Sequence, residues 1–319
     1  MSVGDLVSLN LGSPVVLAFL LGVIAAFIKS DLRFPEQVTS LLSTYLLFAI
    51  GLKGGLRLRE SSVSELAWPV IITLVIGVAT PVIAFFVARS FVRLDTINAA
   101  SLAAHYGSVS AVTFTAAESF ARAAETLEEG FLPALVAVLE IPGIVVALVI
   151  ASRARQGRSM SSAIHEVLTG KSVVLLLGGL IIGTVANQEA LTRVEPFFIG
   201  LFQGLLCLFL LDLGTLAGQR FNSIRRAGAR LLLFATVLPV TFGVIGVLLA
   251  SLVGMSEGGA TVLAAMAASA SYIAAPAAVR VGLPEADIGV SLGAALGVTF
   301  PFNLIIGIPL YSEIASALV

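Results

Sequence analysis

Ten apolar stretches, each about as long as a bilayer-crossing helix, limit how this 319-residue chain can fold. Lipid offers no hydrogen-bonding partner to the backbone, so only helices and closed barrels span it. Hydrophobic residues make up 58% of the chain and charged residues 12%, whereas a soluble domain carries about 25% charged residues. The sequence therefore predicts an all-α integral membrane protein in a lipid bilayer. Its expected transmembrane segments are 13–29, 38–53, 68–90, 97–119, 131–151, 172–188, 196–217, 230–253, 259–280 and 287–310.

The fourth and ninth segments look like one interrupted element written twice. Ala103–Glu118 reads AAHYGSVSAVTFTAAE and Ala264–Val279 reads AAMAASASYIAAPAAV, with six of sixteen positions identical. Both serines of each stretch match, Ser108 with Ser269 and Ser110 with Ser271. Small polar interruptions at corresponding points of two halves are typical of the binding site of a secondary transporter.

The longest polar loop, about 152–171, divides the chain into two sets of five segments. Because five is odd, the second set enters the membrane from the opposite side, which predicts an inverted repeat. The expected units are a first repeat over 1–151, a cytoplasmic linker over 152–171 and a second repeat over 172–319, with the two broken helices crossing at mid-membrane. Of the 18 Lys and Arg residues, 13 fall on the linker side and 5 on the other. The positive-inside rule then predicts that both termini are extracytoplasmic.

A helix broken inside the membrane exposes a new N-terminus, where unpaired N–H groups and the helix dipole favour an anion. Ser110 and Ser271 stand where a capping or ligand hydroxyl is expected, and Pro276 suits the first turn of the later half-helix. Neither break contains Lys or Arg, so dipoles and hydroxyls would balance the charge of a small anion. The alternative is that Gly, Ala and Ser serve only close helix packing.

A coupling cation needs oxygen ligands inside the membrane. The candidates are Thr113, Thr115, Glu140, Thr299 and Asn303. Glu140 can equally be a protonated structural carboxyl, and Asn303 an interhelical hydrogen-bonding group. Lys53, near the outer end of the second segment, is expected to snorkel. No cofactor is expected beyond a sodium ion, and a net charge of −1 gives no case for nucleic acid.

The chain resembles the sodium-dependent bicarbonate transporter family known from cyanobacteria and many other bacteria. The resemblance covers nearly the whole chain and rests on GLKGGLRLRE (Gly51–Glu60), HYGSVSAVTF (His105–Phe114), LEIPGIVVALVI (Leu139–Ile150) and ASASYIAAPAAVRVGLP (Ala268–Pro284). It implies a gate-like and a core-like subdomain, a homotrimer in the bacterial inner membrane, and symport of sodium with bicarbonate. The anion site that it implies is Gly107, Ser108, Val109, Ser110, Ser269, Ala270 and Ser271.

The sequence departs from the family at Tyr272, where cyanobacterial members carry an aspartate, and in its short linker. Family members associate with a small PII-like signalling protein. Because the linker of this chain is short, the sequence leaves open whether it has the same partner.

A sodium symporter of an organic anion, of the bile-acid type, is the closest alternative function. A serine hydrolase built on Ser108 and His105 is disfavoured, because both lie on the same turn of chain. The chain is therefore expected not to be an enzyme.

Overall fold

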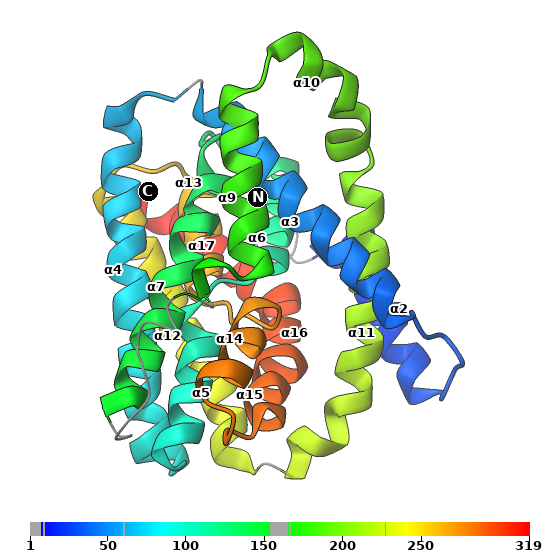
Figure 1. Cartoon of the computed structure of the whole chain (residues 1–319), viewed down its shortest axis with the longest axis vertical. Helices are drawn as coiled ribbons and strands as arrows, with labels where there is room; N and C mark the ends of the chain where they lie inside the picture. Colours follow the sequence, from blue (N-terminus) through cyan, green and yellow to red (C-terminus); the bar gives the residue numbers. More distant parts are fainter. Residues whose placement is uncertain (1–7, 9, 60, 154–164, 166, 227) are drawn as a thin grey trace.

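The computed structural model of the chain describes residues 8, 10–59, 61–153, 165, 167–226 and 228–319 (Figure 1). Every regular element among them is a helix, which confirms the predicted all-α class. Most of the predicted linker, 152–171, lies outside the described residues.

Among the described residues, six helices are long and apolar enough to cross a membrane. They are α3 (Glu36–Leu58); α4 (Val63–Val87) with the π-helix η1 (Ala88–Val92); α7 (Leu132–Arg153); α10 (Gln188–Glu195), η2 (Pro196–Gly200) and α11 (Phe202–Arg226) in succession; α12 (Ala229–Leu252); and the last segment, made of α15 (Ile288–Ala294), η3 (Ala295–Thr299), α16 (Phe300–Phe302), η4 (Asn303–Gly307) and α17 (Ile308–Leu318). Two shorter apolar helices are α2 (Pro14–Phe27) and α9 (Lys171–Val185). Apolar helices exposed on their outer faces fit a multi-pass membrane protein.

The fourth and ninth predicted segments are each a pair of short helices. The first pair is α5 (Thr96–Gly107) and α6 (Ala111–Ala123), and the second is α13 (Glu257–Ala267) and α14 (Ala274–Gly282). Both predicted interruptions are therefore confirmed. The Asp95 carboxylate caps α5 by accepting hydrogen bonds from the N–H groups of Ile97 and Asn98. The bond from the Asn98 backbone, more than any other contact, holds the pKa of Asp95 below its usual range.

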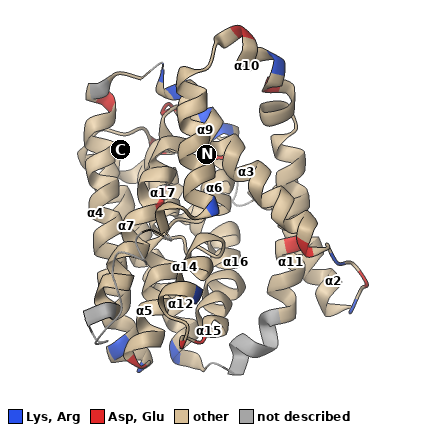
Figure 2. Ribbon diagram, viewed as in Figure 1, with Lys and Arg blue, Asp and Glu red and all other residues tan. Residues whose placement is uncertain are grey.

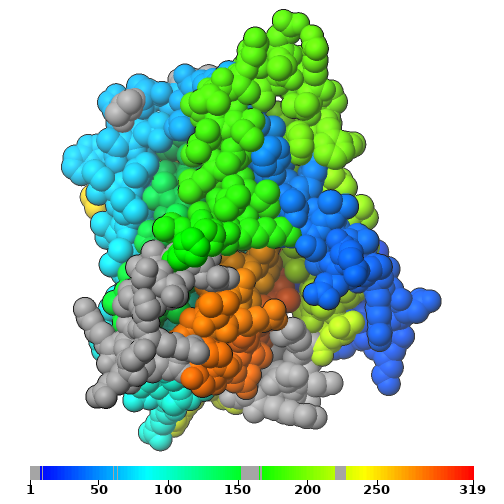
Figure 3. Space-filling model, viewed as in Figure 1, coloured from blue at the N-terminus to red at the C-terminus, as the bar shows by residue number. Residues whose placement is uncertain are grey.

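The helices form two groups, which lie side by side in Figure 1. In the first group α2 packs along α11 and α3 packs along α9. In the second group α4 packs on α5 and α7, while α12 and α17 pack on α13. Both broken helices belong to the second group, and α6 contacts α13 across it. On the face seen in Figure 3, α14 and α15 (orange) reach the surface below α9 (green).

Glycines make the close approach possible in the first group. A Cβ on Gly183 would lie 2.3 Å from the Leu52 carbonyl oxygen, and one on Gly55 would lie 2.1 Å from that of Leu180. The α2–α11 pair is built in the same way, because a Cβ on Gly214 would lie 2.1 Å from the Phe19 carbonyl oxygen. Backbones this close gain van der Waals contact, the main force that joins helices in lipid.

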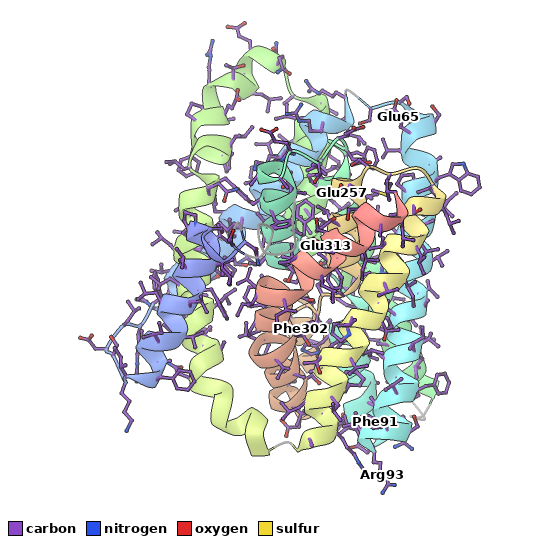
Figure 4. The ribbon with its side chains drawn as sticks, turned by 180° about the vertical axis from the view of Figure 1, so that it is seen from behind. Glu65, Phe91, Arg93, Glu257, Phe302 and Glu313 are labelled. Atoms are coloured by element: carbon purple, nitrogen blue, oxygen red, sulfur yellow. The ribbon has the colours of Figure 1, made fainter. Side chains whose placement is uncertain are left out.

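Many of the charged residues lie toward the top and the bottom of Figure 2, and others lie near mid-height, on α11 and between α2 and α3. In Figure 4, Glu65 and Glu257 lie toward one end, Glu313 lies near mid-height, and Phe91 and Arg93 lie at the other end. The C-terminus belongs to the first of these ends, since the Ser251 hydroxyl at the end of α12 donates to the Leu318 carbonyl. This distribution fits an apolar belt between two aqueous surfaces.

Candidate functional site at two helix breaks

The first break lies between α5 and α6, over residues 108–110. The α5 helix ends at Gly107, whose carbonyl packs so tightly on α7 that a Cβ on Gly143 would lie 1.8 Å from its oxygen. Ser108 is extended, and its hydroxyl donates to the Glu140 carbonyl of α7 at 3.2 Å. Ser110 is the N-cap of α6, and its hydroxyl accepts from the Thr113 N–H at 3.1 Å. Capping replaces one of the hydrogen bonds that the break removes from the backbone.

The second break lies between α13 and α14 and is held by similar contacts. The Ser269 hydroxyl donates to the Met266 carbonyl at 2.7 Å, and Asn303 of η4 donates to the Ala268 carbonyl at 2.8 Å. The Ser271 hydroxyl accepts from the Ala275 N–H at 3.3 Å, at the start of α14. Pro276 is the third residue of this helix, as expected from its position, so its missing N–H leaves no bond unmade.

The two breaks are hydrogen-bonded directly to each other. The Ser110 N–H donates to the Ser269 hydroxyl at 2.8 Å, and the Ser271 N–H donates to the His105 carbonyl at 2.7 Å. The structure thus brings the two predicted serine segments together, although they are about 160 residues apart. All seven residues predicted for the anion site are buried: Gly107, Ser108, Val109, Ser110, Ser269, Ala270 and Ser271.

A small cavity of about 10 Å³ lies where the start of α6 faces the first helix group. Ala111, Val112 and Thr115 line it from α6, and Ser43 of α3 lines it from the other side. The Ser43 hydroxyl is buried and has no hydrogen-bond partner among the described residues. Sequence reasoning missed Ser43, because a single serine in an apolar helix has no repeat or break to mark it. The cavity has about the volume of one water molecule.

The predicted sodium ligands fall into two places. Thr113 and Thr115 lie on α6 just after the first break, and Glu140 lies on α7 beside Ser108. One Glu140 carboxylate oxygen is buried without a partner among the described residues. A buried, unpaired carboxylate oxygen is a suitable cation ligand, since desolvation without a partner is costly.

Thr299 and Asn303 lie in the last segment, and their side chains make interhelical hydrogen bonds. Thr299 donates to the Ala235 carbonyl at 2.6 Å and lies 2.6 Å from the Tyr106 hydroxyl. The Asn303 amide oxygen accepts from the Tyr311 hydroxyl at 2.9 Å, while its amide nitrogen holds the second break. These contacts agree with the alternative role of Asn303 as an interhelical hydrogen-bonding group. Each side-chain oxygen keeps a second lone pair, which is available to a sodium ion.

Tyr272 and His105 add two polar groups beside the breaks. The Tyr272 hydroxyl is buried and lies close to the Ser110 hydroxyl without forming a well-aligned hydrogen bond. The His105 ring lies 2.8 Å from the Ser101 carbonyl through Nδ1, and its Nε2 is buried without a described partner. The Ser108 hydroxyl is directed to Glu140 rather than to His105, so the geometry gives no support to a serine nucleophile.

The full-length comparison with protein families settles the class. The profile of the Na+-dependent bicarbonate transporter superfamily matches residues 14–316, nearly the whole chain. The chain belongs to this superfamily. Comparison with curated proteins finds no match to the chain. Membership in the bicarbonate transporter superfamily indicates a multi-pass membrane transporter rather than an enzyme, and it implies sodium and bicarbonate as the transported species.

Proposed function

We propose that the chain imports bicarbonate by sodium symport, with the anion held at the N-termini of α6 and α14 near the middle of the bilayer. The observation that carries this proposal is the pair of reciprocal hydrogen bonds between the two breaks, from Ser110 to Ser269 and from Ser271 to His105. Each bond fixes one break against the other. The Thr113 N–H of α6 and the Ala275 N–H of α14 are bonded to the capping hydroxyls of Ser110 and Ser271. The other N–H groups of each first turn have no intrahelical partner and would be the donors for an anion.

The size of the space at the breaks supports a small anion. The cavity between Ser43 and the start of α6 is about 10 Å³, and aromatic Phe209 and the apolar Ile273 help to enclose it. The cavity holds about one water molecule, so its walls must move apart to admit bicarbonate, which has four heavy atoms. An organic anion of the bile-acid type would require the two helix groups to move much farther apart. Family membership favours the same choice.

Sodium would bind beside the anion, where Glu140, Thr113 and Thr115 offer oxygen atoms. The Glu140 carbonyl accepts a hydrogen bond from the Ser108 hydroxyl, so a sodium ion bound by the Glu140 carboxylate would lie next to the first break. A cation at this place lowers the electrostatic cost of an anion in the membrane interior. Thr299 and Asn303 would serve a second ion in the other half. No further cofactor is needed.

Helix packing supports an inverted repeat of five plus five helices. Exchanging the two halves turns the α2–α11 pair into the α9–α3 pair, the α4–α5 pair into α12–α13, and the α5–α7 pair into α13–α17, and all six pairs are in contact. We infer that the group α2, α3, α9 and α11 is the gate and that the other group is the core. Rocking one against the other would expose the breaks to each side in turn. By family resemblance, a homotrimer in the bacterial inner membrane is the expected assembly.

The decisive experiment is uptake of radiolabelled bicarbonate into proteoliposomes that contain the purified protein, with and without an inward sodium gradient. We expect accumulation only with the gradient. A matched preparation with an inward potassium gradient controls for membrane potential and leak. Equal uptake under both gradients would contradict sodium coupling, and no uptake by a folded preparation would contradict bicarbonate as the substrate.

A further inference from the structure

A second, larger cavity lies between the two helix groups at the α10 end of the molecule, which is at the top of Figure 1. Its volume is about 430 Å³, and we call it the Lys53 cavity. The side chains that give it its electrostatic character are Lys53, Arg57, Glu118, Arg122 and Glu195. It has room for several water molecules and ions, unlike the small cavity at the breaks.

The Lys53 cavity continues along the same helices that line the small cavity. On α3, Ile50 lines the small cavity and Leu52 and Lys53 line the large one. On α6, Thr115 lines the small cavity and Glu118 lines the large one. Both helices run from the breaks toward the α10 end, so the two cavities lie in series along one seam between α3 and α6.

Lys53 stands at the junction of the two cavities. Its ammonium lies 3.9 Å from the centre of the Phe202 ring. Phe202 is fully buried, and along the chain it lies between Ile199 of η2, which lines the large cavity, and Leu206 of α11, which lines the small one. Within the described part of the chain, no carboxylate lies within ion-pair distance of Lys53. A cation–π contact leaves the other faces of the ammonium open to an anion.

Within the described part of the chain, Lys53 lines the cavity without an ion-pair partner, as does the exposed Glu195. Glu118 is buried and pairs with Arg122 at 2.7 Å, and the Arg122 side chain is 50% exposed. Arg122 is therefore the ion-pair partner of Glu118, which also lies near enough to Lys53 to act on it electrostatically. An ammonium with low-dielectric walls around it and no paired carboxylate raises the local concentration of anions.

We propose that the Lys53 cavity is an anion-collecting site, where the Lys53 ammonium binds a small inorganic anion before it reaches the helix breaks. The proposal rests on the proposed function in one respect, namely that the transported species is an anion. Glu118 keeps the site from holding the anion too firmly, because an ion must leave a relay site as easily as it enters. The sequence predicts that Lys53 snorkels to the membrane surface. That role alone would not require a cavity lined by other charged side chains.

The electrostatic part of the proposal is tested without any transport measurement. In a Cys207→Ser background, Thr192→Cys places one thiol on the cavity wall. Its reaction rates are measured with a sulfonate-bearing and a trimethylammonium-bearing methanethiosulfonate. We expect the anionic-to-cationic rate ratio to fall about three- to tenfold when Lys53→Met is added, and to recover with Lys53→Arg. In 1 M salt, where the screening length is about 3 Å, the difference should vanish.

Ser64→Cys is the matched control, because Ser64 is exposed at the same end but does not line the cavity. Its ratio should change less than twofold on Lys53→Met. A Thr192→Cys ratio that is equally insensitive to Lys53→Met would overturn the proposal.

Uptake kinetics then test whether the collected anion is the substrate. Lys53→Met should raise the KM for bicarbonate about three- to tenfold at low salt, keep the maximal rate within twofold and remove most of the salt dependence of KM. Lys53→Arg should behave as the unmodified protein does, and Arg193→Met, outside the cavity on α10, should have no effect. An unchanged KM in Lys53→Met, beside normal uptake by the unmodified protein, would overturn the relay. If the unmodified protein takes up no bicarbonate, the proposed function fails, while the thiol ratio still decides the anion site.

Discussion

Ser110 has two roles, and substitution by alanine removes only the role of its hydroxyl. Its hydroxyl caps α6, and its backbone N–H joins the two breaks. We predict that Ser110→Ala raises the KM for bicarbonate about tenfold, which is about 1.4 kcal/mol, and also costs about 0.5–2 kcal/mol of stability from the lost cap. Ser62→Ala removes an equivalent cap from α4 far from the breaks. Uptake kinetics and thermal unfolding should show a stability loss in both variants and a KM change only in Ser110→Ala. An equal KM in the two variants would remove Ser110 from the binding site.

Glu140 is the residue whose function the sequence leaves most open, because a buried carboxyl can be an ion ligand or a hydrogen-bonded structural group. In the structure one of its oxygens has no described partner, and the Ser108 hydroxyl binds only the backbone carbonyl of Glu140. Glu140→Gln keeps the size and that backbone contact but removes the charge. We predict that the sodium concentration for half-maximal uptake rises about tenfold or more, since hydrogen bonds and contacts to charged groups contribute about 1.5–3 kcal/mol. A sodium dependence identical to that of the unmodified protein would assign Glu140 to structure alone.

At the scale of the element, the interruptions and the crossing of the two broken helices were predicted from the sequence, whereas the hydrogen bonds between the breaks were not. Ser108 and Ser110, matched by Ser269 and Ser271, mark both breaks because polar residues recur at corresponding points of apolar stretches. The hydrogen bonds between the breaks join residues about 160 positions apart, and no local pattern encodes such a register. The α10–η2–α11 succession also begins earlier than the predicted 196–217, because the polar residues of α10 continue the helix beyond the apolar run.

The glycine contacts between α3 and α9 give a prediction about element packing. A Cβ on Gly183 would meet the Leu52 carbonyl oxygen, whereas Gly178, on the same helix, has open space around it. We predict that Gly183→Val lowers the stability of the detergent-solubilised protein by about 1–3 kcal/mol through overpacking. Gly178→Val should lower it by less than about 0.5 kcal/mol, as expected for a surface substitution. Thermal unfolding of both variants measures the difference. Equal midpoints would show that α3 and α9 do not approach each other as closely as described.

At the scale of the whole molecule, two helix groups meet along one seam, in which both the small cavity beside the breaks and the Lys53 cavity lie. The breaks belong to one group, while Ser43 and Lys53 belong to the other. Neither cavity could be read from the sequence, because each is lined by helices from both halves of the chain. Composition and the length of the apolar stretches give the membrane class and the segments, whereas the seam depends on which helices pack together. Motion of one group against the other would therefore change both cavities at once.

The orientation of this seam in the membrane follows from the distribution of charge. The 13 Lys and Arg residues predicted for one side include Arg93, while Glu65 and Glu257 lie toward the opposite end (Figure 4). Basic loops remain cytoplasmic, so the α10 end and the C-terminus should face outward. In a Cys207→Ser background, a membrane-impermeant maleimide applied to intact cells should label Ser64→Cys and Val319→Cys, which are exposed at that end.

Ser90→Cys, exposed in η1 near Arg93, should be labelled only after the cells are permeabilised. The opposite labelling pattern would reverse the orientation, and labelling of all three positions in intact cells would reveal leaky membranes rather than topology.

The result also decides the role of the Lys53 cavity. If the α10 end faces outward, Lys53 meets the anion before the helix breaks do, and its removal should affect the KM of uptake. If that end faces the cytoplasm, Lys53 meets the anion only after the breaks release it, and the same variant should alter release instead.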